Sequence, residues 1–166
     1  MVDAENSSLR NDFRNAMRLL TSSVHVVTSR DARGPSGMTA TAVCSLSFDP
    51  LSMLVCINRS ATLFETIANA GAFALNLLSD QDLEIALAFG RSSERDSRFA
   101  SGDWQDLETM PVLGSAVSAI ICDTAQTQDF GSHQVIIGRV RDVRMNHSAK
   151  PLLYVDGGFA LAERIG

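Results

Sequence analysis

The chain has 166 residues, of which 45% are hydrophobic and 20% are charged, and its formal net charge is −5. A domain of this length buries about 70% of the surface of its unfolded chain, so one hydrophobic core suffices without disulfide bonds. No apolar run approaches the roughly 20 residues of a membrane-spanning helix. An acidic chain whose only lysine is Lys150 lacks the basic surface of a nucleic-acid-binding protein. We therefore expect one domain over residues 1–166, with neither a membrane nor a nucleic acid as partner.

The N-terminus and the cysteines set expectations for location and for metals. The first residues, MVDAENSSLRNDF, do not join a basic segment to an apolar one, so we expect no secretory signal and a cytoplasmic location. Cys44, Cys56 and Cys122 are odd in number, far apart, and each lies in an apolar stretch, which argues against a disulfide framework and against a zinc site. We expect all three to be small buried core residues and expect no metal.

The first third of the chain predicts a helix followed by strands. Apolar residues recur at helical spacing over 9–20, and residues 6–8 can cap the start, so we expect an amphipathic helix of about thirteen residues. Residues 23–29 are rich in β-branched side chains and predict a strand. Two further strands are expected at about 36–47 and 52–58.

Two capping patterns predict the next helices. Residues 62–65 and 79–82 each place a hydroxyl residue three positions before an acidic residue, as at a helix N-terminus. The first helix should end at Gly71 and the second near Phe89, with a strand at 73–78 between them.

The segment 90–111 is polar, rich in arginine and nearly free of periodicity, so we expect a mobile excursion over the surface. Arg91, Arg95 and Arg98 would share one face if the segment were helical. They could meet the phosphates of a nucleotide there. The interpretation that we prefer is a solvated charged face shared with neighbouring acidic residues.

Strand patterning resumes in the last third of the chain, at 115–127 and 134–145, followed by short runs at 152–155 and 159–162. Several antiparallel strands with isolated helices between them predict an α+β barrel that is mainly β. No G-x-G-x-x-G sequence follows a strand, so a Rossmann dinucleotide fold is not expected.

The most informative segment is 36–62, SGMTATAVCSLSFDPLSMLVCINRSAT. Its Ser and Thr residues fall mostly at odd positions, so we expect their hydroxyls to project to one face of a strand and to suit a polar, phosphorylated ligand. Asn58, Arg59, Ser60 and Thr62 follow where a strand turns into a helix. A guanidinium, hydroxyls and the N–H groups of a helix N-terminus can meet an anion there. The alternative is that Arg59 is a solvated charge and that Ser60 or Thr62 only caps the helix.

These motifs, taken in order, resemble the short-chain flavin reductase family, the NAD(P)H-dependent reductases that supply reduced flavin to two-component monooxygenases. The chain departs from the family at Ser132, where an Asp is usual, at Leu51, where a second proline is usual, and at Phe159, which is often Tyr. The resemblance spans roughly residues 13–161. The motifs that carry it are Gly37-Met38-Thr39-Ala40-Thr41, Cys44-Ser45-Leu46-Ser47, Asp49-Pro50, Cys56-Ile57-Asn58-Arg59-Ser60, Gly131-Ser132-His133 and Pro151-Leu152-Leu153-Tyr154.

The resemblance implies a fold and an activity. The fold would be an FMN-binding split β-barrel with flanking helices, with a core of about 9–162, usually as a homodimer. The activity would be that of an NAD(P)H:flavin oxidoreductase of the EC 1.5.1 type, which passes a hydride from NADH or NADPH to FMN or FAD and supplies a separate oxygenase. Two alternatives stay open: a barrel that stores flavin without rapid turnover, and one that holds FMN as a prosthetic group.

The resemblance also implies site residues. His133 would be the catalytic residue, orienting the nicotinamide, although a lone histidine in a loop is often only a surface residue. Hydride transfer is carried by the two cofactors, so no acid–base pair is required. His25 and His147 are expected to be structural. The flavin-binding residues implied are Met38, Thr39, Ala40, Thr41, Ser45, Leu46, Ser47, Asn58, Arg59, Ser60, Thr62, Phe89, Phe99 and Tyr154, of which the two phenylalanines could equally anchor the core.

Overall fold

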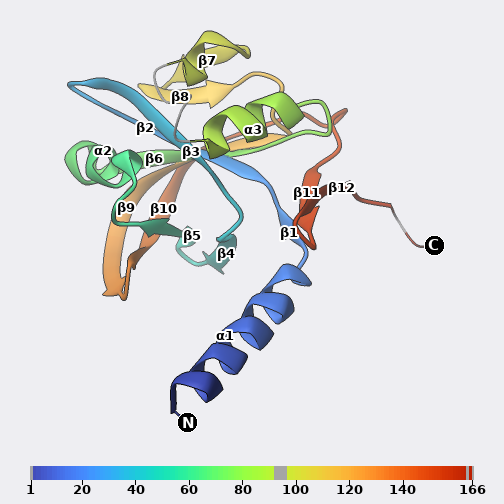
Figure 1. Ribbon diagram of the computed structural model, residues 1–166. Helices are drawn as coiled ribbons and strands as arrows, with labels where there is room; N and C mark the ends of the chain where they lie inside the picture. Colours follow the sequence, from blue (N-terminus) through green and yellow to red (C-terminus); the bar gives the residue numbers. More distant parts are fainter. Residues whose placement is uncertain (1, 92–96, 164, 166) are drawn as a thin grey trace.

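The structure is a computed structural model that describes residues 2–91, 97–163 and 165 (Figure 1). Its helices are α1 (Val2–Arg18), α2 (Thr62–Ala70), α3 (Leu83–Gly90) and the short 3-10 helix η2 (Arg98–Ala100). Its strands are β1 (Ser22–Ser23), β2 (His25–Asp31), β3 (Gly34–Ala40), β4 (Val43–Phe48), β5 (Leu51–Asn58), β6 (Ala72–Leu77), β7 (Trp104–Leu107), β8 (Met110–Leu113), β9 (Ser118–Phe130), β10 (His133–Met145), β11 (Leu152–Val155) and β12 (Gly158–Leu161).

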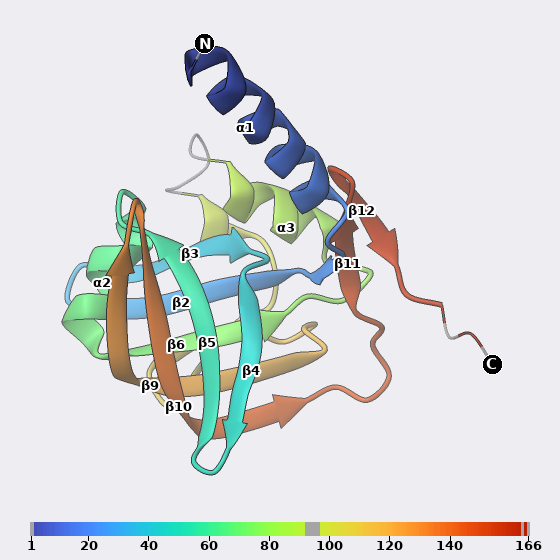
Figure 2. The same cartoon turned by 90° about the horizontal axis from the view of Figure 1, so that it is seen from below.

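A curled seven-stranded antiparallel sheet forms the body of the molecule, with strand order β3-β2-β6-β9-β10-β5-β4 (Figure 2). β3 and β4 follow one another in the chain but lie at the two edges of this sheet. The bend at residues 41–42 carries the chain from one edge to the other, and Ala42 accepts a hydrogen bond from the Cys56 amide at 3.0 Å. The sheet therefore stays open between β3 and β4, with the chain crossing from one edge to the other and no ladder joining them. This is the arrangement of a split barrel, and it confirms the predicted mainly β, α+β class.

The prediction of one strand over 36–47 is wrong, because the chain breaks at this bend. Thr39 lies on β3, whereas Ser45 and Ser47 lie on β4 at the opposite edge. Val43 packs against the barrel core, and by alternation Ser45 shares its side of the strand. The hydroxyls therefore do not form one row on one face.

Three clusters of apolar side chains pack against the sheet. The barrel interior contains Val27, Ile57, Phe73 and Ile136, and Leu63 and Ile67 of α2 join this cluster at one end. A second cluster lies under α3 around Phe89, and a third joins β6 and β9 to Met110 and Val112 of β8. β2 and β6 are buried along almost their whole length because both of their faces are covered.

The helix starts differ from the predicted capping boxes. The N-cap of α2 is Ala61, without a side-chain cap, and Glu65 instead pairs with Arg33. The N-cap of α3 is Asp82, whose carboxylate accepts hydrogen bonds from the backbone and hydroxyl of Ser79 and so ties the preceding loop. The predicted stop at Gly71 is confirmed, since this residue adopts the left-handed conformation with φ 66°.

Most of residues 97–109 are exposed, as expected for a surface excursion, but the segment contains η2 and the β7–β8 pair rather than irregular chain, and its mobility stays a prediction. Arg98 is only 9% exposed, and Phe99 and Trp104 pack on Phe89 with ring centroids 5.1 Å and 5.0 Å away. Arg91 lies in extended backbone and Arg98 in η2, so they share no helical face, and Arg95 lies outside the described residues. Backbone carbonyls accept hydrogen bonds from the Arg98 guanidinium and so offset the cost of burying its charge, and periodicity does not reveal these contacts.

All three cysteines were expected in the core, but this prediction is wrong for two of them. Cys122 is buried, but Cys56 is half-buried and Cys44 is exposed, because both lie on the outer face of the β4–β5 pair. None of the helices in the described part of the chain is long and apolar enough to cross a membrane.

The N-terminal helix is longer than predicted and stands away from the barrel (Figures 1 and 2). Its last residue, Arg18, joins it to the β11–β12 turn. The Arg18 Nε donates to the Asp156 carboxylate at 3.1 Å, and its Nη2 donates to the Asp156 carbonyl at 2.9 Å.

His25 makes folding stability depend on pH. It is 7% exposed between Ala40 and Leu77, and burial lowers its pKa from 6.5 to about 4, while a hydrogen bond to the Ser23 backbone partly opposes this. Below pH 6.5 the unfolded state binds more protons than the folded state. We predict that the free energy of unfolding loses up to about 3 kcal/mol as the pH falls from 6.5 to 4.

The variant His25→Gln should lose this component of the pH dependence, as measured by urea denaturation at a series of pH values. His147→Gln is the matched control, because His147 is exposed and its loss should leave the slope unchanged. An unchanged slope in His25→Gln would show that other groups set the acid sensitivity.

Candidate functional site

A polar cavity of about 230 Å³ lies at the N-terminus of α2, between β3 and the end of α3. It brings together residues from four segments that are distant in sequence. Among the predicted site residues it includes Met38, Thr39, Asn58, Ser60, Thr62 and Phe89, and it adds Gly37, Ala61, Leu63, Gly90 and Arg98. We refer to it as the phosphate cavity, because its donors suit an anion.

The loop before α2 aims the helix N-terminus at this cavity. The Asn58 side-chain oxygen accepts hydrogen bonds from the Ser60 amide at 3.0 Å and from its hydroxyl at 2.9 Å, and the Ala61 amide bonds the Asn58 carbonyl at 2.9 Å. Asn58 therefore shapes the turn. The Phe64 amide donates to the Ala61 carbonyl at 3.0 Å, whereas the amides of Thr62 and Leu63 precede the hydrogen-bond ladder of the helix. The helix dipole adds positive potential at this end.

Arg98 adds a positive charge to the wall of the phosphate cavity. Its Nη1 donates to the Gly37 carbonyl at 2.8 Å, its Nε donates to the Ala88 carbonyl at 3.2 Å, and its guanidinium lies 5.8 Å from the Phe89 ring centroid. These contacts hold a buried cation beside the helix N-terminus. Sequence reasoning placed Arg98 on a solvated face, and no local pattern in 90–111 signals its burial.

A second, more apolar cavity of about 440 Å³ adjoins the first, with Thr39 and Gly90 in the walls of both. We call it the ring cavity. Tyr154 and Phe159 lie in its wall with ring centroids 5.3 Å apart. The Thr39 hydroxyl donates to the Ala86 carbonyl at 2.7 Å and so holds α3 against β3. The predicted residues Ala40, Thr41 and Tyr154 line the ring cavity, and Val24, Ala86, Leu87, Arg91 and Gly157 complete it.

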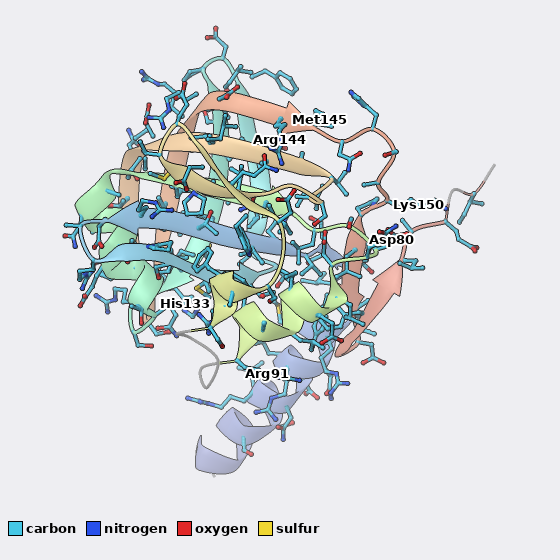
Figure 3. The ribbon with its side chains drawn as sticks, turned by 90° about the horizontal axis from the view of Figure 1, so that it is seen from above. Asp80, Arg91, His133, Arg144, Met145 and Lys150 are labelled. Atoms are coloured by element: carbon cyan, nitrogen blue, oxygen red, sulfur yellow. The ribbon has the colours of Figure 1, made fainter. Side chains whose placement is uncertain are left out.

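The β9–β10 turn, which carries the predicted Gly-Ser-His motif, lies beside the end of β5 and the loop before α2. His133 pairs with Asn58 across the β10–β5 ladder, and the Arg59 amide donates to the Ser132 carbonyl at 3.0 Å. In the view of Figure 3, His133 and Arg91 lie toward the edge of the outline opposite Arg144. His133 itself is exposed and is not among the residues that line either cavity, so its role in the site stays a prediction.

Arg59 contacts this turn and does not line either cavity. Its Nη2 donates to the Gly131 carbonyl at 2.7 Å, and its Nη1 lies 3.4 Å from the Asp129 carboxylate. The sequence predicts a phosphate contact for Arg59, but its hydrogen bonds in the structure position the turn that carries His133.

Ser132 precedes His133 at the position where the family that the sequence resembles usually has Asp. The Ser132 hydroxyl lies 2.9 Å from His133 Nδ1, within hydrogen-bond distance. When the hydroxyl donates to Nδ1, the proton of a neutral imidazole resides on Nε2. The departure at Ser132 therefore keeps a hydrogen-bond partner for the imidazole and removes a negative charge.

The remaining predicted flavin-binding residues line neither the phosphate cavity nor the ring cavity. Ser45, Leu46 and Ser47 lie on β4 at the other edge of the sheet, and the Ser47 hydroxyl bonds the backbone of Asp49. Phe99 packs on Phe89 and borders a third cavity. Their predicted flavin contacts stay predictions.

Known proteins resemble this chain over nearly its whole length. Residues 17–162 match the model of the flavin reductase like domain, so the chain belongs to the flavin reductase family, as predicted. It is 38% identical over 152 residues to "FMN reductase (NADH) RutF" of Agrobacterium fabrum, covering 91% of this chain and 86% of that protein. It is 34% identical over 150 residues to the "4-hydroxyphenylacetate 3-monooxygenase reductase component" of Pseudomonas aeruginosa, covering 89% and 88%.

The fold agrees with the same family. The solved structure of the flavin reductase PheA2 superimposes with a TM-score of 0.84 at 28% identity, covering 93% of this chain and 98% of that one. The predicted split-barrel fold is confirmed.

The geometry separates two roles for Arg59. If Arg59 positions the turn, Arg59→Ala should lower turnover about tenfold through misplacement of His133 and leave the flavin dissociation constant unchanged. Arg139→Ala is the control, because Arg139 is exposed on the same strand as His133. Steady-state kinetics and flavin fluorescence titration measure the two quantities. A tenfold weaker flavin affinity with normal turnover would instead support the phosphate contact.

Proposed function

We propose that this chain is an NAD(P)H-dependent flavin reductase of the EC 1.5.1 type, which reduces FMN or FAD and supplies a separate oxygenase. The observation that carries the proposal is that the two cavities adjoin, with Thr39 and Gly90 in the walls of both. One is polar, with a helix N-terminus and Arg98, and the other is apolar, with Tyr154 in its wall. A flavin mononucleotide has the same two parts, a phosphate and a planar ring.

The donor set fits this ligand. The first amides of α2 and the Arg98 guanidinium would hold the phosphate, and the Thr39–Thr41 backbone and Tyr154 would border the ring. Bound flavin supplies hydride acceptance from the nicotinamide ring. The protein therefore has to orient the two rings and exclude water. The Ser132–His133 pair would orient the nicotinamide carboxamide from the start of β10.

The proposal that this chain supplies reduced flavin to a separate oxygenase is based on its relatives. One of them is named as the reductase component of a monooxygenase. A phosphate held by helix amides and one guanidinium, without a covalent link, allows the flavin to exchange. We extend that role to this chain as part of the proposal.

The test is NADH consumption with and without added flavin. We expect little oxidation of the nicotinamide nucleotide without flavin and rapid oxidation with FMN or FAD. Absorbance measures the oxidation of NADH and of NADPH. Ser132→Ala and His133→Ala should slow turnover without weakening flavin binding, whereas the exposed His147→Ala should be neutral. Tight flavin binding with no oxidation of either nucleotide would contradict the reductase and favour a flavin store.

We also infer that the chain works as a homodimer. Leu9, Phe13, Met17 and Leu20 lie along and just after α1 with exposed fractions between 48% and 69%, and α1 stands away from its own barrel (Figure 2). Exposing an apolar stripe of this kind on a helix to water is energetically unfavourable. A second copy of the chain would cover it.

The variant Phe13→Asp should raise the dimer dissociation constant by more than about tenfold, because a buried aromatic side chain contributes about 1.5–3 kcal/mol. Asn15→Asp is the matched control, since it adds the same charge on the same helix without removing apolar surface. Sedimentation velocity measures the result. A monomeric wild-type chain, or equal dissociation of both variants, would contradict the dimer through α1.

A further inference from the structure

The β11–β12 hairpin forms one wall of the ring cavity. Tyr154, Gly157 and Phe159 lie in that wall, whereas β3 and α3 supply most of the other lining residues. In the flavin reductase proposed above, this cavity takes the flavin ring. The position of the hairpin relative to β3 and α3 therefore determines the space in which the ring binds.

The hairpin is small, and its two ends are held in different ways. It belongs to a three-stranded sheet in which β1 contributes only two residues and β12 is an edge, and so small a sheet is weakly stable by itself. At its base, Leu152 is buried under α3 and bonds the backbones of Val24 and Leu78. At its tip, Asp156 and Gly157 have φ angles of 50° and 81°, as in a two-residue type I′ turn. The turn fixes the shape of the tip but not its place beside the cavity.

Arg18, the last residue of α1, holds the tip through three hydrogen bonds. Its Nε donates to the Asp156 carboxylate at 3.1 Å, and its Nη2 donates to the Asp156 carbonyl at 2.9 Å. The Arg18 carbonyl accepts from the Asp156 amide at 2.6 Å. This carbonyl belongs to the last turn of α1, whose carbonyls have no partner within the helix, so the tip also caps the helix. A Cβ at Gly157 would lie 2.9 Å from Arg18 Nη2, which shows how closely the guanidinium covers the turn.

We propose that Arg18 is a positioning residue for the ring cavity, because it fixes the hairpin tip and thereby the wall that borders the flavin ring. Tyr154 precedes the turn by two positions and Phe159 follows it by two, and they face each other across the β11–β12 ladder. Arg18 does not line the cavity, so it acts through the hairpin. This inference rests on the proposed flavin reductase function.

The same contact joins α1 to the cavity. α1 stands away from the barrel, and its end lies beside β11 and β12 (Figures 1 and 2). The ion pair is exposed, with side-chain fractions of 53% and 67%, and such a pair contributes little alone. The two hydrogen bonds to the Asp156 backbone add a directional restraint. A change in the position of α1 would therefore move the tip and the wall of the cavity.

The test measures the binding of riboflavin and FMN to Arg18→Ala by fluorescence titration. Riboflavin has the same ring as FMN but lacks the phosphate. Both dissociation constants should rise about fivefold, because a looser wall weakens the contacts of the shared ring. Their ratio should stay that of the wild-type chain, since neither Arg18 nor Asp156 lines the phosphate cavity.

Two further variants isolate the contact. Arg10→Ala is the matched control, because Arg10 is exposed on the same helix about two turns earlier, and it should leave both constants unchanged. Asp156→Asn keeps an oxygen acceptor for Arg18 Nε and the backbone hydrogen bonds, so its constants should stay within about twofold of wild type. Hydrogen exchange of the free chain should be faster over 152–161 in Arg18→Ala and unchanged in β2 and β6.

Three outcomes would overturn the assignment. The dissociation constants could be unchanged in Arg18→Ala, the constant for FMN alone could rise, or exchange over 152–161 could be unaffected. Failure of the proposed function looks different. A wild-type chain that binds both flavins without oxidising NADH or NADPH would contradict the reductase and leave the effect of Arg18 on ring binding measurable. If the wild-type chain bound neither flavin, hydrogen exchange would still decide whether Arg18 holds the hairpin.

Discussion

The open seam between β3 and β4 is the constraint on which the rest of this structure depends. Two strands joined by a bend at residues 41–42 normally form a hairpin, but here they lie at opposite edges of a seven-stranded sheet. An unpaired edge must be covered. The β3 edge is covered by α3, which the Thr39 hydroxyl holds through the Ala86 carbonyl. The spaces that this cover leaves along β3 are the cavities of the site.

Arg98 stabilises the same contact between β3 and α3. A guanidinium that is only 9% exposed would be costly without acceptors, and the carbonyls of Gly37 and Ala88 provide them. One side chain thereby joins β3, the end of α3 and η2. Its position beside the N-terminus of α2 means that the contact that orders this part of the chain also makes the phosphate cavity positive.

The turn at the start of β10 shows how a departure from the family pattern is accommodated. Ser132 keeps a hydrogen-bond partner at His133 Nδ1, and Arg59 ties the turn to the loop before α2 through the Gly131 carbonyl. The histidine is therefore oriented by two neighbours that the chain itself supplies. The anchoring role of Arg59 is visible only once β10 and β5 are paired.

The sequence by itself determined the family, most helices and strands, and the loop at residues 58–62, because these depend on periodicity and on neighbours a few positions apart. The α+β class and the left-handed stop at Gly71 belong to the same group. Only the tertiary structure decided that the segment 36–47 is split between two sheet edges, that Arg98 is buried, and that Cys44 is exposed. Alternation shows which residues share a face of a strand, but what covers that face is set by segments that are distant in the chain.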